Sequence, residues 1–522
     1  MATRGSKKTN RRHGGLWRRI ASRWRRALGR EGAPPRAGRA ANLLIISDLH
    51  LGEDCKPGRN IAFLRRLVVV ERKLCEFLDH YTLRRRGGQP WRLIINGDMV
   101  DFMHVHLIPE DWCEDPDLAH GDERRFGIGT GPQAVDRKLE RILDRHPGVF
   151  ERFARFVAAG NELAIVIGNH DVEFHWPEVQ EQFKGRLAGL VDEGARERVY
   201  AGITFYPWFY CEQGLVYVEH GHQYDASSSW DAFLDPRTGH SDEELELNLS
   251  AASVRYFINL NPHMDPHGKS NWGIRRFVGW SIRQGFGRSL RIAYHYSYFA
   301  WRLINLWRQY GHEGRVRRRA DHLRKLHEVA EGFGLSPDVV LQLDALRRRP
   351  ATASIWEVLR VLCLDRVILY CGAAALVALG FLALTPVRAV VAGAGISIGT
   401  ILLARAMEKG RNLDPARWLP PTAEKIRKSV GVPLVVFGHT HDALQVPLED
   451  GGWYFNTGTW IDGQEAGDGV PFTHLIVKHV KEDIHARLYR WEERSIPLAE
   501  IPGAVLPRQK HDPAVDDRAQ VG

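Results

Sequence analysis

The chain has 522 residues, which is too long for one ordinary core, so we expect a main domain with a sizeable accessory region. Its 44% hydrophobic and 26% charged residues are ordinary for a globular protein and do not by themselves indicate a membrane protein. The six cysteines form no CxxC pair, and the N-terminus lacks the compact apolar core of a signal peptide. A reducing, cytosolic setting is therefore favoured for the main domain.

The first 40 residues are strongly basic. They hold thirteen Lys or Arg and a single acid, Glu31, so the tail carries +12 and the rest of the chain −3 of the total +9. Apolar residues recur in it at near-helical spacing: Trp17, Ile20, Trp24 and Leu28. An amphipathic basic helix of this kind would suit an anionic membrane surface. The alternatives are a disordered, solvated tail and a tail that contacts nucleic acid nonspecifically.

Five short apolar runs each end in a cluster of metal-ligand side chains. We expect buried strands over residues 43–47, 93–96, 163–167, 215–219 and 433–437. The clusters that follow them are Asp48-Leu49-His50, Gly97-Asp98-Met99-Val100-Asp101, Gly168-Asn169-His170-Asp171, His220-Gly221-His222 and Gly438-His439-Thr440-His441. Ligands at the carboxyl ends of neighbouring strands converge in one crevice. The sequence therefore predicts a metal site assembled from the whole length of the chain.

A long insertion, residues 263–410, separates the fourth cluster from the fifth. Its first part, residues 270–310, mixes aromatic side chains with arginines, which is typical of helices at a lipid headgroup boundary. The alternative is aromatic packing against the main domain with the arginines facing water. A polar helical segment follows to about residue 350, within which Ser336, Pro337 and Asp338 predict a helix start.

Two long runs without charge follow, over residues 367–385 and 389–404, with Pro386 and Arg388 between them. At 1.5 Å per residue they would cover about 28 and about 24 Å, close to the hydrocarbon thickness of a bilayer. We therefore expect a membrane hairpin at about 367–404. Cations on both outer sides predict that both ends and the main domain lie in the cytoplasm, at an inner or cytoplasmic membrane. The alternatives are a buried hairpin of a soluble core and a re-entrant element.

The remaining chain returns to the main domain, which we expect to consist of residues 41–262 and 411–500. Residues 453–460 and 472–480 are expected to form strands joined by a turn. The polar residues 501–522 are expected to be a disordered tail.

The five clusters supply what a phosphate-binding pair of divalent ions requires. Asp48 and His50 can reach one ion from one strand end, and Asn169 offers a neutral oxygen where another carboxylate would add too much negative charge. Gly97 lets the backbone approach the ions closely. His439 and His441 can project together toward adjacent ions.

The ordered series DxH, GDxx[DN], GNH[DE], an isolated His and GHxH resembles the calcineurin-like metallophosphoesterase superfamily. The resemblance covers residues 43–225 and 430–490. It implies an α/β fold, a layered sandwich of two mixed β-sheets flanked by helices, here with a helical, membrane-associating insertion. It also implies two divalent ions that are both bound by Asp98. We expect Mn²⁺, with Fe or Zn²⁺ as alternatives. The implied ligands are Asp48, His50, Asp98 and His441 for one ion, and Asp98, Asn169, His220 and His439 for the other.

The implied activity is hydrolysis of a phosphoester or diphosphate by a hydroxide shared between the two ions, attacking phosphorus in line. The resemblance assigns His170 to transition-state stabilisation and leaving-group protonation, and we expect Asp171 to orient its ring. The alternative is a purely structural His-Asp pair. We expect Asp101 to support the ligands, and His222 to be a substrate contact or an ordinary loop histidine. Three more histidines are expected at the pocket or on the surface: His104, His106 and His175.

Protein serine/threonine phosphatases of the superfamily read GDxVDRG, whereas here Phe102 and Met103 follow Asp101, which argues against that class. The opening at residues 47–51 is similar to that of bacterial UDP-2,3-diacylglucosamine pyrophosphatases. Those enzymes have GNRD and HGD where this chain has His170 and His222. We expect a lipid-linked or nucleotide-linked substrate at the membrane, with nucleic acid disfavoured as a partner. The alternatives are a nuclease-type phosphodiesterase and a non-catalytic membrane-associated scaffold.

Overall fold

The computed structural model describes residues 41–55, 61–85, 87–108, 121–261, 264, 274–309, 312–409, 415–461, 470–480, 483–498 and 504–507. The predicted N-terminal tail, the first residues of the insertion and residues 508–522 lie outside these ranges.

The first sheet has eight strands. Their order is β12-β11-β10-β1-β2-β3-β4, and β13 also pairs with β11. Strands β1 to β4 are parallel, whereas β10 lies antiparallel to β1. The bounds are β1 Asn42–Ile46, β2 Trp91–Asn96, β3 Glu162–Val166, β4 Ile203–Tyr206, β10 Thr473–Val480, β11 Asp483–Trp491, β12 Ser495–Pro497 and β13 Ala504–Pro507. Strands from both ends of the chain therefore form one mixed sheet.

The second sheet has five strands in the order β5-β6-β7-β9-β8. Strands β6, β7 and β9 are parallel, and the two edge strands are antiparallel to their neighbours. The bounds are β5 Phe209–Glu212, β6 Val216–Glu219, β7 Leu434–Phe437, β8 Leu444–Pro447 and β9 Trp453–Asn456. Because β6 precedes the insertion and β7 follows it, this sheet joins the two parts of the main domain.

The apolar strands are buried on both faces. In β1, Leu43 and Ile45 pack in the core between the sheets, which also holds Val436 of β7. Leu44 and Ile46, which point the other way, pack in the core that includes the helices. Period-two alternation thus sends successive residues into two different cores, which explains why these strands are continuously apolar. The five expected buried strands are confirmed, and so is an α/β fold with two mixed sheets flanked by helices.

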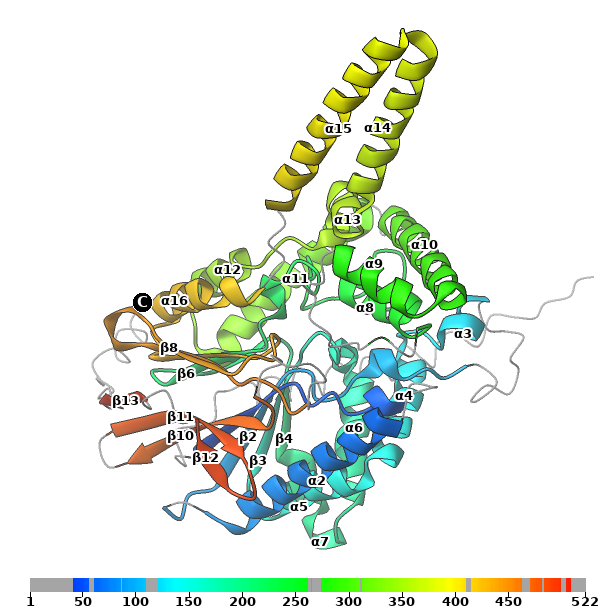
Figure 1. Cartoon of the computed structure of the whole chain (residues 1–522). Coiled ribbons are helices and arrows are strands. Elements are labelled where there is room, and N and C mark those ends of the chain that lie inside the picture. The colour runs from blue at the N-terminus through cyan, green and yellow to red at the C-terminus, as the bar shows by residue number, and fades with distance from the viewer. Residues whose placement is uncertain are drawn as a thin grey trace, which may run out of the picture.

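Helices cover the outer face of each sheet (Figure 1). Five helices lie on the side of the eight-stranded sheet: α2 Ile61–Leu83, α4 Pro132–Arg145, α5 Pro147–Ala158, α6 Pro177–Gly189 and α7 Glu193–Ala201. Helix α16, Leu419–Val430, lies against β7 and β9 of the other sheet, with α12, Pro337–Ala345, beside it. Ser336 caps α12 by accepting from the amide of Val339, so the predicted helix start is confirmed.

The described part of the insertion is helical. A short π-helix precedes it, η7 Val254–Ile258, which continues α8 Leu249–Ser253. The insertion itself contains α9 Ile274–Arg283, α10 Phe286–Gln309, α11 His312–Phe333, α12, α13 Ile355–Val361, α14 Leu364–Ala383 and α15 Pro386–Lys409. Figure 1 shows α14 and α15 side by side, projecting away from the rest of the molecule.

The projecting hairpin is long, apolar and exposed. Residues Leu364–Ala383 and Pro386–Met407 are each long and apolar enough to cross a membrane, and only 6% and 11% of their most apolar windows are buried. Length and composition alone do not place them in a bilayer, but their exposure rules out the alternative of a buried core hairpin. The sequence predicts that Pro386 lies in the turn of the hairpin, but in the structure it is the first residue of α15. A proline is well tolerated at the first position of a helix.

Two further expectations near the C-terminus need correction. The strand expected over residues 453–460 ends at Asn456. Residues 504–507, expected to be disordered, form β13 because their backbone pairs with β11. Pairing partners far away in the chain are invisible to a reading of local composition.

Candidate metal centre

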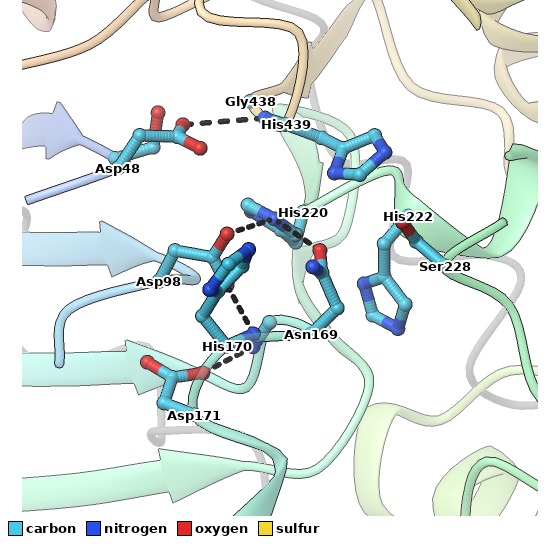
Figure 2. Close-up of polar contacts among 12 residues, drawn as sticks. Asp48, Asp98, Asn169, His170, Asp171, His220, His222, Ser228, Gly438 and His439 are labelled. Carbon is cyan, nitrogen blue, oxygen red and sulfur yellow. Dashed lines mark hydrogen bonds and ion pairs between the residues drawn. The ribbon is translucent and has the colours of Figure 1, made fainter. Parts of the chain in front are cut away.

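The five clusters meet where the strands of the two sheets end. Asp48, Asp98 and Asn169 follow β1, β2 and β3 of the eight-stranded sheet, whereas His220 and His439 follow β6 and β7 of the five-stranded sheet. Figure 2 shows the side chains of both groups facing one another. The candidate ligands therefore come from two sheets, not from the edge of a single one.

The backbone at these strand ends is strained. Nine described residues other than glycine have a positive φ, and five of them belong to the clusters. Those five are Asp48 (φ 55°), His50 (46°), Asp98 (52°), His439 (70°) and His441 (61°). A side chain in this left-handed region costs about 1 kcal/mol or more. Such outliers gather where the backbone must turn to aim several ligand side chains at one point.

The first donor group consists of Asp48, His50, His441 and Asp98. His441 Nε2 lies 3.1 Å from Asp48 Oδ1 and 3.3 Å from His50 Nε2. His50 Nε2 lies 3.7 Å from Asp98 Oδ2. Ligand atoms about 2.0–2.2 Å from one ion are about 3.0–3.6 Å apart. The first two separations match the edges of a coordination shell, and the third, to Asp98, is slightly longer.

The second donor group consists of Asp98, His220 and Asn169. His220 Nε2 lies 3.1 Å from Asp98 Oδ2 and 3.2 Å from Asn169 Oδ1. His220 Nδ1 lies 2.8 Å from the carbonyl oxygen of Asn96, to which we assign the ring proton. With this proton on Nδ1, Nε2 faces two acceptor oxygens, a position that either a second ring proton or a bound cation can fill. Asp98 Oδ2 belongs to the first group as well and lies between the two groups.

His439 is held differently from the other expected ligands. Its Nε2 lies 3.1 Å from Asp225 Oδ2, and its backbone amide donates to Asp48 Oδ2 over 3.2 Å. Its ring lies edge-on to His220, with 5.3 Å between the centroids. Because Asp225 occupies Nε2, Nδ1 is the ring nitrogen left for an ion. The sequence reading missed Asp225, which lies five residues after His220 in the same loop.

Asp101 lies behind the first donor group and contacts three histidines. Its Oδ2 is 3.3 Å from His50 Nδ1, 2.7 Å from His104 Nδ1 and 2.9 Å from His170 Nδ1. The carboxylate fixes the proton of His50 on Nδ1 and so presents Nε2 to the ion site. The structure thus places Asp101 in the supporting position that the sequence predicts, and it places His104 beside it.

The predicted partnership of Asp171 with His170 is wrong. The carboxylate of Asp171 accepts the backbone amides of Gly168, over 2.7 Å, and Met99, over 2.8 Å. Asp101 orients the His170 ring in its place. Adjacent residues of a tight turn point apart, so Asp171 ties the turn after β3 to the turn after β2. Among the described residues the Asp171 carboxylate thus binds the backbone of two turns and not the His170 ring. The backbone amide of His170 donates to Asp98 Oδ1 over 2.8 Å, which joins His170 to the donor groups.

His222 is buried beside the centre without joining it. Its Nε2 lies 2.9 Å from Gln223 Nε2, and its ring packs edge-on against Phe233 and Trp230. Burial, followed by the charges of His220 and His439, holds the pKa of His222 well below its ordinary value. His222 is therefore a buried ring packed against aromatic side chains. His106 lies further out, beside the carbonyl of Arg125, and His175 packs edge-on against Phe233.

Two glycines allow the strand ends to approach each other. A Cβ on Gly97, which has φ 79°, would lie 2.3 Å from His220 Nδ1. A Cβ on Gly168 would lie 2.2 Å from Asp98 Oδ1. Real Cβ atoms do not come this close to other atoms, so both positions require glycine. The sequence predicts a close approach of Gly97 to the ions, and the structure shows a close approach of Gly97 to the His220 ring.

The buried carboxylates and histidines of the site hold one another in their charged forms. Burial alone would raise the pKa of Asp48 and Asp98, but His441 for Asp48 and His220 for Asp98 hold both pKa values well below the ordinary range. Burial likewise opposes the charged form of His220, yet Asp98 and Asp48 raise its pKa to about 9. Buried carboxylates that can hold a proton so firmly on a histidine provide a strong site for cations.

The donor set fits divalent cations. Asp48 Oδ1 is fully buried and receives no hydrogen bond of good geometry, although His441 Nε2 lies near it. Groups of three ligand atoms within 4.8 Å of one another include Asp48 with His50 and His441, and Asp48 with Asp98 and His220. Mixed nitrogen and oxygen donors of this kind suit Mn²⁺, Fe or Zn²⁺. The described residues thus form His/Asp clusters that are compatible with two ions.

Comparison with known proteins adds little. No protein-family profile and no curated protein matches the chain. A crystal structure of a dimetal phosphatase from Danio rerio aligns over 90% of this chain and 100% of its own, at 10% sequence identity and a TM-score of 0.29. A likeness at this level carries no weight for function, which therefore has to be inferred from the geometry of the site.

Proposed function

We propose that this protein is a metal-dependent phosphoester or diphosphate hydrolase of the calcineurin-like metallophosphoesterase superfamily. The observation that carries the proposal is the position of Asp98 Oδ2, which lies 3.1 Å from His220 Nε2 on one side and 3.7 Å from His50 Nε2 on the other. One carboxylate oxygen between two donor groups is what a bridging ligand requires. The ordered series of five motifs supports the same family.

The proposed ligands follow from the two donor groups. Asp98 belongs to both sets. The first ion would be held by Asp48, His50, Asp98 and His441, and the second by Asp98, Asn169, His220 and His439. Bound there, two divalent ions would supply a nucleophilic water at neutral pH and would neutralise the charge that gathers on the phosphoryl oxygens. We propose Mn²⁺ as the first metal to test.

The chain's own residues hold and protonate the substrate. Asp101 fixes the Nδ1 proton of His170, so Nε2 is the ring nitrogen that can donate to a phosphoryl or leaving-group oxygen. The charges of Asp101 and Asp98 raise the pKa of His170 against the effect of burial, which favours a ring that carries a proton to donate. His170 is thus the proposed acid of the reaction.

We propose a lipid-linked or nucleotide-linked phosphoester at a membrane as the substrate, with the catalytic domain on the cytoplasmic side of an inner membrane. Support comes from the exposed apolar hairpin α14-α15, which would remain unfavourably hydrated outside a bilayer. Cations flank its base, with Arg366 before the first apolar run and Arg405 after the second. The departures at His170 and His222 leave the diacylglucosamine substrate without support.

The test is hydrolysis by purified full-length protein in mild detergent with Mn²⁺. The panel holds p-nitrophenyl phosphate, bis(p-nitrophenyl) phosphate, nucleotide diphosphate esters, lipid-linked diphosphates and single-stranded DNA. We expect Mn²⁺-dependent turnover that a chelator abolishes. Asp98→Asn should lose both ions and turnover, whereas Asp192→Asn, an exposed aspartate before α7, should keep both. Full turnover by Asp98→Asn would refute the bridging assignment, and hydrolysis of DNA alone would favour a nuclease.

A further inference from the structure

Helix α10 is apolar on two opposite faces. One face, which includes Ile292, Phe299 and Leu303, is buried against the rest of the protein. The opposite face is exposed and carries four large apolar side chains: Phe286 (87% exposed), Leu290 (63%), Tyr294 (57%) and Trp301 (55%). Spacings of four, four and seven residues place these four on one stripe of the helix. A helix needs one apolar face to pack on its own protein, so the second face points to an external partner.

The surroundings of this stripe are basic. No acidic residue occurs between Asp265 and Glu313, a segment that holds seven arginines and one lysine. Arg283, Arg288 and Arg291 are exposed and form no ion pair with any residue that the structure describes. A partner that covers the stripe would therefore gain by being negatively charged.

The stripe lies near the base of the projecting hairpin. Helix α10 contacts α13, which leads directly into α14. The hydroxyl of Tyr296 on α10 donates to the carbonyl of Leu362, two residues before α14 begins. Figure 1 shows α9, α10 and α13 grouped where the hairpin leaves the protein. Trp356 of α13 is also 75% exposed there. If the hairpin enters a bilayer, these side chains lie at the headgroup layer.

We propose that the exposed stripe of α10 is a docking surface for an anionic lipid bilayer. Phe286, Leu290, Tyr294 and Trp301 enter the headgroup boundary, and Arg288 and Arg291 bind the lipid phosphates. Aromatic and aliphatic side chains flanked by arginines are the composition that such a boundary favours. This inference rests on the proposed membrane location and does not depend on the hydrolytic reaction.

Docking at α10 would bring the lipid surface close to the metal centre. Phe257 of η7 stacks on Phe299 of α10, with 6.1 Å between ring centroids. Asn259, just after η7, donates its side-chain amide to the carbonyl of Met103 over 2.9 Å. Met103 precedes His104, which binds Asp101 behind the donor groups. One π-helix thus separates the docking surface from the support of the metal site, so the substrate would be a phosphoester presented by the membrane itself.

The experiment uses full-length protein in lipid nanodiscs, with a fluorescent amino acid replacing Leu290. The control places the same amino acid at Leu190, which is 46% exposed directly after α6. Figure 1 shows α7, the next helix, at the end of the molecule opposite the hairpin. Nanodiscs contain brominated phospholipid as the quencher and either no anionic lipid or about 30 mol% of it. We expect quenching at position 290 in anionic nanodiscs, weaker quenching in neutral ones and none at position 190.

Charge variants test the role of the arginines. A single arginine near an anionic surface contributes about 1 kcal/mol, so Arg291→Gln should lower the docking equilibrium about fivefold. Arg196→Gln, on the exposed surface of α7, should leave it unchanged. About 0.5 M salt should weaken docking of the wild-type protein because it screens the phosphates.

The absence of quenching at position 290 in anionic nanodiscs would overturn the proposal. A blue-shifted emission in detergent together with a dimeric mass would also overturn it, because a second copy of the chain would then cover the stripe. Hydrolysis of soluble phosphoesters is measured in parallel. Failure of that reaction with intact quenching would count against the proposed function, and failure of quenching with intact hydrolysis would count against the docking surface.

Discussion

Replacing Gly168 by alanine tests the geometry on which the proposed metal centre depends. The added Cβ would lie 2.2 Å from Asp98 Oδ1 and 2.6 Å from the Asp98 amide nitrogen. Non-bonded heavy atoms normally stay about 3.5 Å apart, so the turn after β2 must retreat by about 1 Å. This movement also strains the bond from the His170 amide to Asp98 Oδ1, now 2.8 Å long.

A displacement of about 1 Å at a reacting centre costs about 100-fold in rate. We therefore expect kcat/KM of Gly168→Ala to fall about 100-fold, with loss of at least one of two bound Mn²⁺ ions. Overpacking should also lower the free energy of unfolding by about 1–3 kcal/mol. The assays are phosphoester hydrolysis, metal content by mass spectrometry and thermal unfolding, all on the folded, monodisperse fraction.

The matched control is Gly189→Ala at the end of α6, where an added Cβ meets nothing within 4 Å. That variant should keep both ions and the full rate. If Gly168→Ala also bound two ions and turned over at the wild-type rate, the placement of Asp98 between two donor groups would be refuted.

Three more variants separate the two ion sites and the insertion. Asp101→Asn removes the acceptor of the His50 Nδ1 proton. In a Mn²⁺ titration this variant should bind the first ion about 10–100-fold more weakly and the second ion as tightly as the wild type does. Asp225→Asn removes the partner of His439 and should weaken binding of the second ion while the first stays tightly bound. Loss of both ions in either variant would contradict the assignment of these ligands to two separate sites. Asp344→Asn breaks buried pairs on α12 and should lower the free energy of unfolding at pH 7 by about 3 kcal/mol. Burial would raise the pKa of Asp344, but hydrogen bonds from His322 and Arg319 lower it, so its stabilisation is present above about pH 4 and is lost at lower pH. The difference in urea midpoint between wild type and Asp344→Asn should accordingly shrink as the pH falls below about 4, and a constant difference would refute this origin.

Much of the fold could be predicted from local patterns. The five apolar runs, such as the one that forms β1, could be predicted as buried strands because a strand that is covered on both faces consists of apolar residues throughout. The glycine before Asp98 signalled a close backbone approach, and Ser336 before Pro337 signalled a helix start. These signals need only neighbouring residues.

The failures share a physical cause. The sequence predicted a pair of His170 with the adjacent Asp171, but in the turn after β3 the two side chains point apart. His170 instead contacts Asp101, which follows the neighbouring strand β2. Residues 504–507 were expected to be disordered, but they form β13 by pairing with β11. In each case a partner distant in the chain outweighed the local preference.

By itself the sequence determined which side chains could bind metal and that each would stand at a strand end, because ligand chemistry and hydrophobic periodicity are properties of short segments. Only the tertiary structure decided that β1, β2 and β3 belong to one sheet and β6 and β7 to another. Only it decided that residues at the ends of these strands meet at one site. Only it decided that Asp225 holds His439 and that Asp98 lies between the two donor groups. Distances of about 3 Å between residues hundreds of positions apart are set by the packing of sheets and helices, which no local pattern records.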